Sequence, residues 1–435
     1  MSITESMSPT DALPFLTADV PAMPGAIKRR YEDFLVEEIP AYQPCGSGDH
    51  IYFTIEKRGL ATMRAIHDIG RALGVQSRDI GLAGLKDARA ITIQTLSIEH
   101  IDPKKVASLD IPRIRVLSVS RHGNKLRIGH LRGNRFRIKL RDCDPGRFSD
   151  LESVLETLHK RGVPNYFGSQ RFGSRGDTGT IGRAVLQRDA GLVMDLMLGK
   201  AGPHDTGEVL RARQLYDAGE YEAAAKAWPY GFRDNARACR AMARSGGKHK
   251  RAFHAIDQRL RKFFVSAYQS ALFNRCLALR LDQLDRVMEG DLACKHENGS
   301  VFLVTDAAAE APRAASFEIS PTGPIFGARM TCAQGEPRRF EQAILDAEQI
   351  VPDDFRAVKG MKVHGSRRPL RFAMEDLHIE RGSDDHGAYV ELAFALDAGC
   401  YATTILREIC KSDLQEGLDN EGGVDRDAGS AEIEN

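Results

Sequence analysis

The strongest constraint on the fold is a six-residue run that alternates strictly between cationic and apolar residues: Arg135, Phe136, Arg137, Ile138, Lys139 and Leu140. Because successive side chains point to opposite faces of a β-strand, this run predicts a strand with one apolar and one basic face. The segment 91–98 is rich in β-branched residues and also predicts a strand. Apolar residues recur at helical spacing in the segment 61–73, which predicts an amphipathic helix that stops at Gly74. An α+β fold is therefore expected.

The chain is long enough for more than one hydrophobic core, since it has 435 residues, and two domains are expected. Gly162-Val-Pro164 breaks the pattern and marks a candidate boundary. The segment from 178 to about 279 is rich in helix formers and predicts mostly helices. Residues 1–24 contain four prolines without periodicity, so we expect a flexible extension there.

Charge is unevenly distributed along the chain, although the formal net charge is only +1. Residues 412–435 carry eight acidic residues and one basic residue, a net charge of −7, which leaves +8 on the remainder. Segments of this composition rarely fold, so an acidic disordered tail is expected. The basic remainder suits a partner that carries phosphates, although many proteins hold such a charge for solubility alone.

Several classes of protein are disfavoured by composition. No apolar run approaches the length of a membrane-spanning helix, and the N-terminal residues do not resemble a secretory signal. The eight cysteines form no Cys-x-x-Cys pair, and the histidines show no metal-binding spacing. We therefore expect a cytoplasmic protein with reduced cysteines, no metal site and no membrane partner.

The stretch 81–94 (GLAGLKDARAITIQ) places Asp87 between Lys86 and Arg89, after two glycines and before the strand predicted at 91–98. Nearby cations keep a carboxylate ionised. An ionised carboxylate on a loop can act as a nucleophile or a general base. A salt-bridged surface turn explains the same residues without any catalysis, and the residues alone leave both interpretations open.

This stretch also resembles the catalytic-loop signature of the TruD family of tRNA pseudouridine synthases. Five further segments resemble the family in the same order: 28–37 (KRRYEDFLVE), 46–57 (GSGDHIYFTIEK), 121–136 (RHGNKLRIGHLRGNRF), 163–173 (VPNYFGSQRFG) and 398–408 (AGCYATTILRE). The resemblance implies isomerisation of uridine to pseudouridine in tRNA, at position 13 of the D-arm, without a cofactor. The alternatives are a non-catalytic RNA-binding or RNA-folding protein on this scaffold, and an unrelated carboxylate enzyme such as a glycosidase, which usually needs two carboxylates.

The resemblance implies an α+β fold in which a catalytic domain with a mostly antiparallel central sheet is interrupted by an inserted α+β domain. The catalytic domain would comprise residues 25–161 and 371–411, and the inserted domain residues 162–370. The flexible extension (1–24) and the acidic tail (412–435) would flank them. The sequence does not determine the oligomeric state, and a monomer is favoured.

The resemblance also assigns roles to individual residues. Asp87 matches the family's catalytic aspartate, and Lys28 matches an active-site lysine that we expect to pair with Asp87. Phe34, Asn134 and Phe136 match residues that bind the target base. Their alternatives are a core position for each phenylalanine and a turn amide for Asn134.

Contact with RNA phosphates is expected from cations near these motifs: Arg89, Arg121, Lys125, Arg132 and Arg171. The segment 251–268 interleaves cations with aromatic residues, which suits RNA but equally suits a helix with a packed aromatic face and a solvated basic face. Cys400 replaces the serine that is commoner in the family, and extra length falls between Gly176 and Gly247. These departures leave the proposed chemistry in place and make the choice of RNA less certain.

Overall fold

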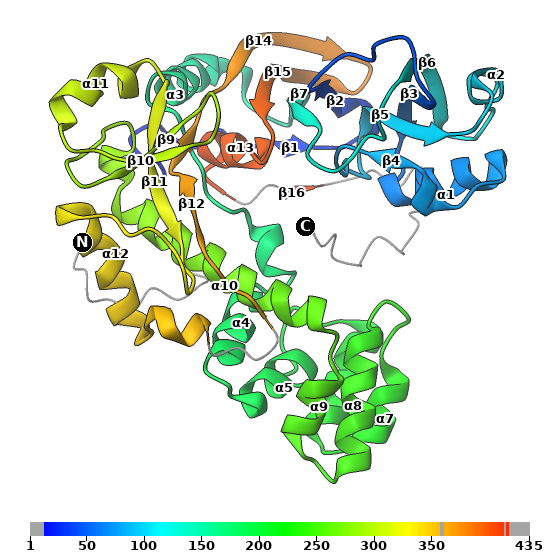
Figure 1. Ribbon diagram of the computed structural model, residues 1–435, viewed down its shortest axis with the longest axis vertical. Coiled ribbons are helices and arrows are strands. Elements are labelled where there is room, and N and C mark those ends of the chain that lie inside the picture. Colours follow the sequence, from blue (N-terminus) through cyan, green and yellow to red (C-terminus); the bar gives the residue numbers. More distant parts are fainter. Residues whose placement is uncertain (1–12, 357–360, 413–414, 417–435) are drawn as a thin grey trace. The chain divides into compact units, whose positions relative to one another are not determined.

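The computed structural model describes residues 13–356, 361–412 and 415–416 (Figure 1). The chain forms two compact units. The sheet unit comprises the described residues of Thr17–Val163 and Phe372–Ala428. The helical unit comprises the described residues of Met1–Leu16 together with Pro164–Arg371.

A ten-stranded sheet is the framework of the sheet unit. Its main path runs through β14 (Glu375–Asp384), β15 (Gly387–Asp397), β7 (Leu131–Arg141), β2 (Phe34–Pro40), β5 (Ile91–Glu99), β3 (His50–Arg58) and β6 (Ile114–His122). The remaining strands are β1 (Ala26–Ile27), β4 (Gly81–Leu82) and β16 (Gln415–Glu416). The pairs β2–β5 and β1–β16 are parallel and the other pairs are antiparallel. The expected α+β fold with a mostly antiparallel sheet is confirmed.

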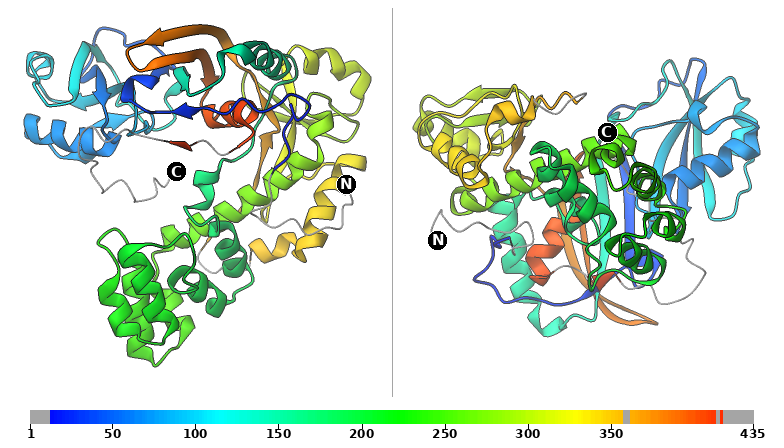
Figure 2. Two further views of the ribbon diagram at one scale, coloured as in Figure 1. Left: turned by 180° about the vertical axis from the view of Figure 1, so that it is seen from behind. Right: turned by 90° about the horizontal axis from the view of Figure 1, so that it is seen from below.

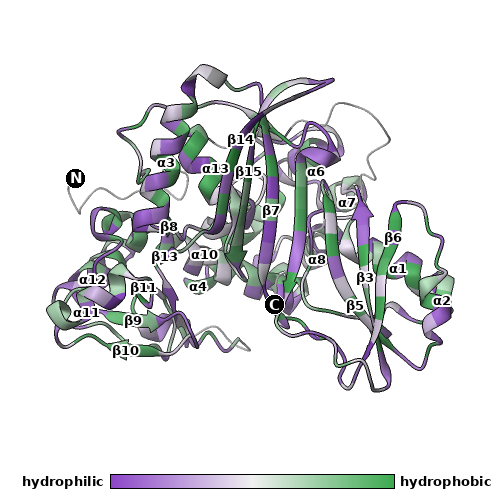
Figure 3. Ribbon diagram, turned by 90° about the horizontal axis from the view of Figure 1, so that it is seen from above, coloured by the Kyte–Doolittle hydropathy of each residue, from purple (hydrophilic) through white to green (hydrophobic). Residues whose placement is uncertain are grey.

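The alternating run lies in β7, between β2 and β15. Phe136, Ile138 and Leu140 are buried, whereas Arg135 and Arg137 are exposed. Figure 3 shows β14, β15 and β7 side by side, with hydrophobic and hydrophilic residues interspersed along each strand. β15 comes from the far end of the sequence, so most of the helical unit lies between β7 and β15 along the chain.

Within the described residues, four α-helices accompany the sheet: α1 (Thr62–Leu73), α2 (Pro103–Ala107), α3 (Phe148–Arg161) and α13 (Ala402–Cys410). Helix α1 ends at Gly74, whose φ of 72° is left-handed and suits glycine. Its apolar face packs Ile66 and Ile69 against residues of β3 and β5 in one hydrophobic core. Helix α3 packs on α13, so the C-terminal helix belongs to the core of this unit.

The helical unit contains nine α-helices within its described residues: α4 (Thr178–Leu186), α5 (Ala190–Leu198), α6 (Gly207–Asp217), α7 (Tyr221–Ala227), α8 (Arg233–Ser245), α9 (His249–Ala255), α10 (Gln258–Leu279), α11 (Ala307–Ala315) and α12 (Gly335–Glu348). Its sheet has the order β10 (Val301–Leu303), β9 (Leu292–Lys295), β11 (Ile319–Ile325), β12 (Ser366–Pro369). Helix α10 packs on both α4 and β11 and so joins the helices of this unit to its sheet (Figure 2). A two-stranded sheet pairs β8 (Val163–Pro164) with β13 (Arg371–Phe372).

The first residues of the described chain are anchored, in contrast to the flexible extension expected up to residue 24. The Thr17 hydroxyl donates to Oε2 of Glu408 at 2.8 Å, and the Met23 N–H donates to the Ile409 carbonyl at 3.0 Å. Both side chains are buried, so the expectation is wrong for residues 13–24, and residues 1–12 lie outside the described residues. Most of the acidic tail also lies outside them, but Gln415 and Glu416 pair with β1. No described helix is long and apolar enough to cross a lipid bilayer.

Candidate active site

Asp87 lies on the loop between β4 and β5 and forms an ion pair with Lys28. The Lys28 Nζ is 2.5 Å from Oδ2 of Asp87. The other carboxylate oxygen accepts the backbone N–H of Arg89 at 2.8 Å. The Asp87 side chain is 33% exposed and that of Lys28 is 3% exposed. The site is therefore a partly open carboxylate that rests on a buried ammonium.

Lys28 directly follows strand β1 in the chain. Its φ of 55° is left-handed, which is uncommon for a residue other than glycine. Its Nζ lies 4.6 Å from the centre of the Phe34 ring. The ammonium therefore contacts a carboxylate and an aromatic ring at once.

Opposing influences act on the pKa of Asp87. Burial raises this pKa, but the charge and hydrogen bond of Lys28, the Arg89 N–H and the charge of Lys57 together lower it below its ordinary value. The carboxylate is therefore ionised at neutral pH.

Lys86 and Arg89, the cations next to Asp87 in the sequence, do not both place their charge beside its carboxylate. The Lys86 ammonium is 2.8 Å from Oε2 of Glu38, and both side chains are almost completely buried. Lys86 is thus neutralised by another carboxylate, and Arg89 reaches Asp87 through its backbone N–H. Lys86 therefore neighbours Asp87 in the sequence without pairing with it, and the ammonium that pairs with Asp87 is that of Lys28.

Lys57 was not identified from the sequence, yet its side chain holds the loop that carries Asp87. Its side chain is completely buried, and its Nζ donates to the carbonyls of Leu60 at 2.6 Å and Asp87 at 2.9 Å. The backbone N–H of Lys86, on the same loop, donates to the Thr62 hydroxyl of α1 at 2.9 Å. A signal for Lys57 exists in the sequence, because it continues the inward-facing alternation of Ile51, Phe53 and Ile55.

The aromatic candidates lie together on the buried face of the sheet. The rings of Phe34 and Phe136 meet edge to face with centres 6.3 Å apart, and Phe136 also contacts Phe394 at 5.6 Å. Phe34 is 4% and Phe136 is 8% exposed, so each has a place in the core, and Phe34 also lies beside Lys28.

Asn134 lies two residues before Phe136 on β7, opposite Glu38 of β2 and Leu396 of β15. Its Oδ1 is buried and accepts no hydrogen bond from the described residues. Most buried polar atoms have a hydrogen-bond partner. This oxygen is therefore an acceptor to which a bound ligand could donate.

The cations expected to contact RNA are divided between the two units. Arg89, Arg121 and Arg132 are exposed on the sheet unit, and Arg132 pairs with Glu375 at 2.6 Å. Arg121 donates to the Gly48 carbonyl at 3.0 Å and Lys125 to the Arg78 carbonyl at 2.9 Å. Arg171 belongs to the helical unit, where it donates to the Ser266 hydroxyl at 2.6 Å and lies over the Phe263 ring.

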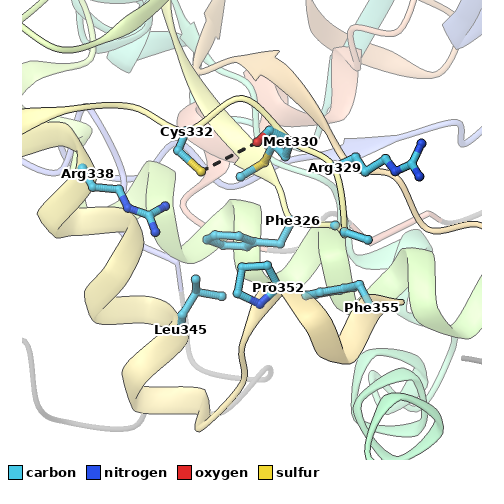
Figure 4. A pocket seen from close by; sticks show the side chains of 10 residues that line it. Phe326, Arg329, Met330, Cys332, Arg338, Leu345, Pro352 and Phe355 are labelled. Atoms are coloured by element: carbon cyan, nitrogen blue, oxygen red, sulfur yellow. Dashed lines mark hydrogen bonds between the residues drawn. The ribbon is translucent and has the colours of Figure 1, made fainter. Parts of the chain in front are cut away.

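A pocket of about 130 Å³ lies in the helical unit. Figure 4 shows Phe326, Leu345 and Phe355 at this pocket, with Arg329 and Arg338 also lining it. None of the site residues expected from the sequence lines it. The described residues also contain no group of three or more histidine, cysteine, aspartate or glutamate side chains that could hold a metal ion.

The family model of tRNA pseudouridine synthase D (TruD) matches residues 13–409. The chain is 46% identical over 397 residues to tRNA pseudouridine synthase D of Geobacter sulfurreducens, covering 91% of this chain and 96% of that protein. It is 47% identical over 398 residues to the protein of the same name in Geobacter metallireducens, covering 91% and 97%. It also resembles the crystal structure of the putative tRNA pseudouridine synthase D (TruD) of Methanosarcina mazei, with a TM-score of 0.80, 26% identity and coverage of 94% and 97%.

Proposed function

The chain belongs to the TruD family of tRNA pseudouridine synthases, and we propose that it isomerises uridine 13 in the D-arm of tRNA with Asp87 as its nucleophile or base. The proposal rests first on one observation, the partly exposed Asp87 carboxylate on the buried Lys28 ammonium. Its scaffold would be the discontinuous catalytic domain 25–161 plus 371–411, interrupted by the inserted domain 162–370.

The chemistry of the reaction explains why such a pair suits it. Pseudouridine formation breaks the N-glycosidic bond, turns the detached uracil and rejoins it to the sugar through C5. The bond exchange involves no net oxidation or reduction. Attack of the carboxylate on the sugar and abstraction of a sugar proton both require Asp87 in its ionised form, which Lys28 favours.

The detached uracil must be retained while it turns, and we assign this task to Phe34, Asn134 and Phe136. A phenyl ring can stack on the base, and the unsatisfied Asn134 oxygen can accept a hydrogen bond from an N–H of uracil. A target within structured RNA must first leave its stack, and contacts in the pocket offset the cost of unstacking. Arg89, Arg121, Lys125, Arg132 and Arg171 remain the proposed phosphate contacts.

The test is release of tritium from tRNA labelled at uracil C5, because formation of the C–C bond expels that hydrogen. Wild type should release tritium, whereas Asp87→Asn should release none and still bind tRNA. The matched control is Asp142→Asn, which removes an exposed carboxylate that pairs with Arg29 at 2.7 Å and should leave turnover unchanged.

Turnover by Asp87→Asn would remove Asp87 from its proposed role. If wild type binds RNA but releases no tritium from any tRNA, the non-catalytic RNA-binding alternative is favoured. Mapping the modified position in tRNA separates position 13 from other uridines.

A further inference from the structure

Helix α8 of the helical unit carries four arginines on one face. Arg233, Arg237, Arg240 and Arg244 are spaced by four, three and four residues, which places them in a row along a helix. All four are exposed, and the opposite face of α8 is buried through Ala238, Cys239, Ala241 and Met242. We call these four residues the arginine row.

The bundle beneath the row explains why it stays in place. Helix α8 packs between α7 and α9, and α6 packs on α7. Figure 1 shows α7, α8 and α9 side by side. The first and last members of the row are eleven residues apart, about 16 Å along the helix axis, so a packed scaffold presents several guanidinium groups at once.

Acidic side chains of the described residues neutralise little of the positive charge of the arginine row. Arg237 is 3.4 Å from Asp234, but the side chains of Arg240 and Arg244 form no hydrogen bond or ion pair with any residue of the described chain. Residues 233–262 contain ten lysines and arginines and only two acidic residues. Like charges this close repel one another, so an anionic partner would relieve the repulsion.

An exposed aromatic ring lies beside the row. Tyr230 is 80% exposed, the largest fraction among the exposed large hydrophobic side chains of the described chain. The Arg233 guanidinium lies 4.2 Å from the centre of its ring. A flat ring beside a cation is a typical stacking platform for an unpaired base, whereas a surface that binds acidic peptides or lipid headgroups by charge alone does not need one.

We propose that the arginine row and Tyr230 form an RNA-binding surface on the helical unit, where the row contacts phosphates and Tyr230 stacks on an unpaired base. Arginine suits this task because its planar guanidinium binds phosphate with two parallel hydrogen bonds. The identification of this RNA as tRNA rests on the proposed function. These residues are separate from those assigned to the Asp87 site.

The first test measures how the affinity for fluorescently labelled tRNA depends on salt. In the double variant Arg240→Gln/Arg244→Gln, the slope of log affinity against log salt should become shallower by about 1.5, since each phosphate contact contributes about 0.7 to 0.9. The control is Lys104→Gln/Lys105→Gln, which removes the same charge from two exposed lysines of α2 and should leave the slope unchanged. An unchanged slope in the arginine variant, or the same change in both variants, would overturn the proposal.

The second test addresses stacking. Tyr230→Ala should weaken binding of the full tRNA by roughly tenfold, in the range measured for loss of one base–aromatic stack. Tyr230→Phe should bind like wild type because it retains the ring. Unchanged binding by Tyr230→Ala, or an equal loss in both variants, would refute the stacking contact.

Tritium release by the same proteins distinguishes the two proposals. Altered slopes without any release by wild type would leave the RNA surface standing and refute the proposed function. Tritium release by wild type, together with unaltered slopes in the arginine variant, would support the proposed function and refute the RNA surface.

Discussion

At the scale of single residues, the Asp87 site depends on a balance between burial and charge. Burial raises the pKa of Asp87, while Lys28 contributes the largest lowering influence. The ion pair therefore stabilises the fold at pH values above the ordinary aspartate pKa of about 4, and this stabilisation is lost as the pH falls through the lower pKa of the folded state.

Replacing Lys28 by methionine should raise the pKa of Asp87, because burial then acts with less opposition. The acidic limb of the pH–rate profile for tritium release should move to higher pH, while Lys28→Arg should keep a profile close to that of wild type. Arg29→Met provides the control, since Arg29 is an exposed neighbour that pairs with Asp142. A Lys28→Met profile identical to that of wild type would contradict the pairing of Lys28 with Asp87 in catalysis.

Lys57 positions the loop that carries Asp87, and its replacement by methionine should affect both stability and turnover. The variant leaves partly buried carbonyls without their donor, which costs about 1–3 kcal/mol of unfolding free energy. Because Asp87 is held less firmly, kcat should fall by about tenfold or more while KM changes little. Urea unfolding and steady-state kinetics measure these effects. Arg58→Met, an exposed cation one residue further along β3, serves as the control, and equal losses in the two variants would refute a specific role for Lys57.

At the scale of elements, β7 and β15 approach unusually closely at Gly133. A Cβ atom at this position would lie 2.1 Å from the Leu396 carbonyl oxygen, so any larger residue must push the two strands apart. Asn134 follows directly, which couples the spacing of the strands to a candidate base-binding residue.

Gly133→Ala should therefore destabilise the sheet unit by about 1–3 kcal/mol, as overpacking does elsewhere, and should also lower turnover. Denaturant unfolding and tritium release report the two effects. Gly123→Ala is the matched control, since a Cβ there meets nothing within 4 Å. Wild-type stability in Gly133→Ala would show that the strands separate at little cost.

At the scale of the whole molecule, the near-neutral net charge combines a basic body with acidic C-terminal residues. Residues 417–435 contain six acidic residues and one basic residue, so removing them raises the formal net charge from +1 to +6. They lie outside the described residues, and the sequence predicts that they take no part in the site.

Removal of residues 417–435 should leave turnover intact and leave tRNA binding unchanged or tighter. Any gain in affinity should disappear at high salt, where charges separated by more than the screening length no longer interact. A full-length variant with the six acidic residues changed to their amides separates charge from chain length. Weaker binding after truncation would show that these residues contribute to the RNA site.

The sequence by itself determined the elements whose signals are local. Alternation over 135–140 predicted β7, helical spacing and Gly74 predicted α1 and its end, and the motif around Asp87 indicated the family. These predictions succeed because backbone periodicity and turn chemistry depend on residues within one turn or one strand. The family resemblance also predicted the pairing of Lys28, in the segment 28–37, with Asp87.

The tertiary structure alone decided which side chains meet. Lys28 and Asp87 meet although they are 59 residues apart. Lys86 pairs with Glu38 and not with Asp87. The buried Lys57 holds the loop by donating to backbone carbonyl oxygens, a contact that amino-acid composition does not predict. Thr17 is anchored by Glu408, 391 residues away, so part of the extension that the sequence predicted to be flexible belongs to the core. These contacts depend on the register and order of strands brought together from distant parts of the chain, and such long-range pairing leaves no trace in local periodicity.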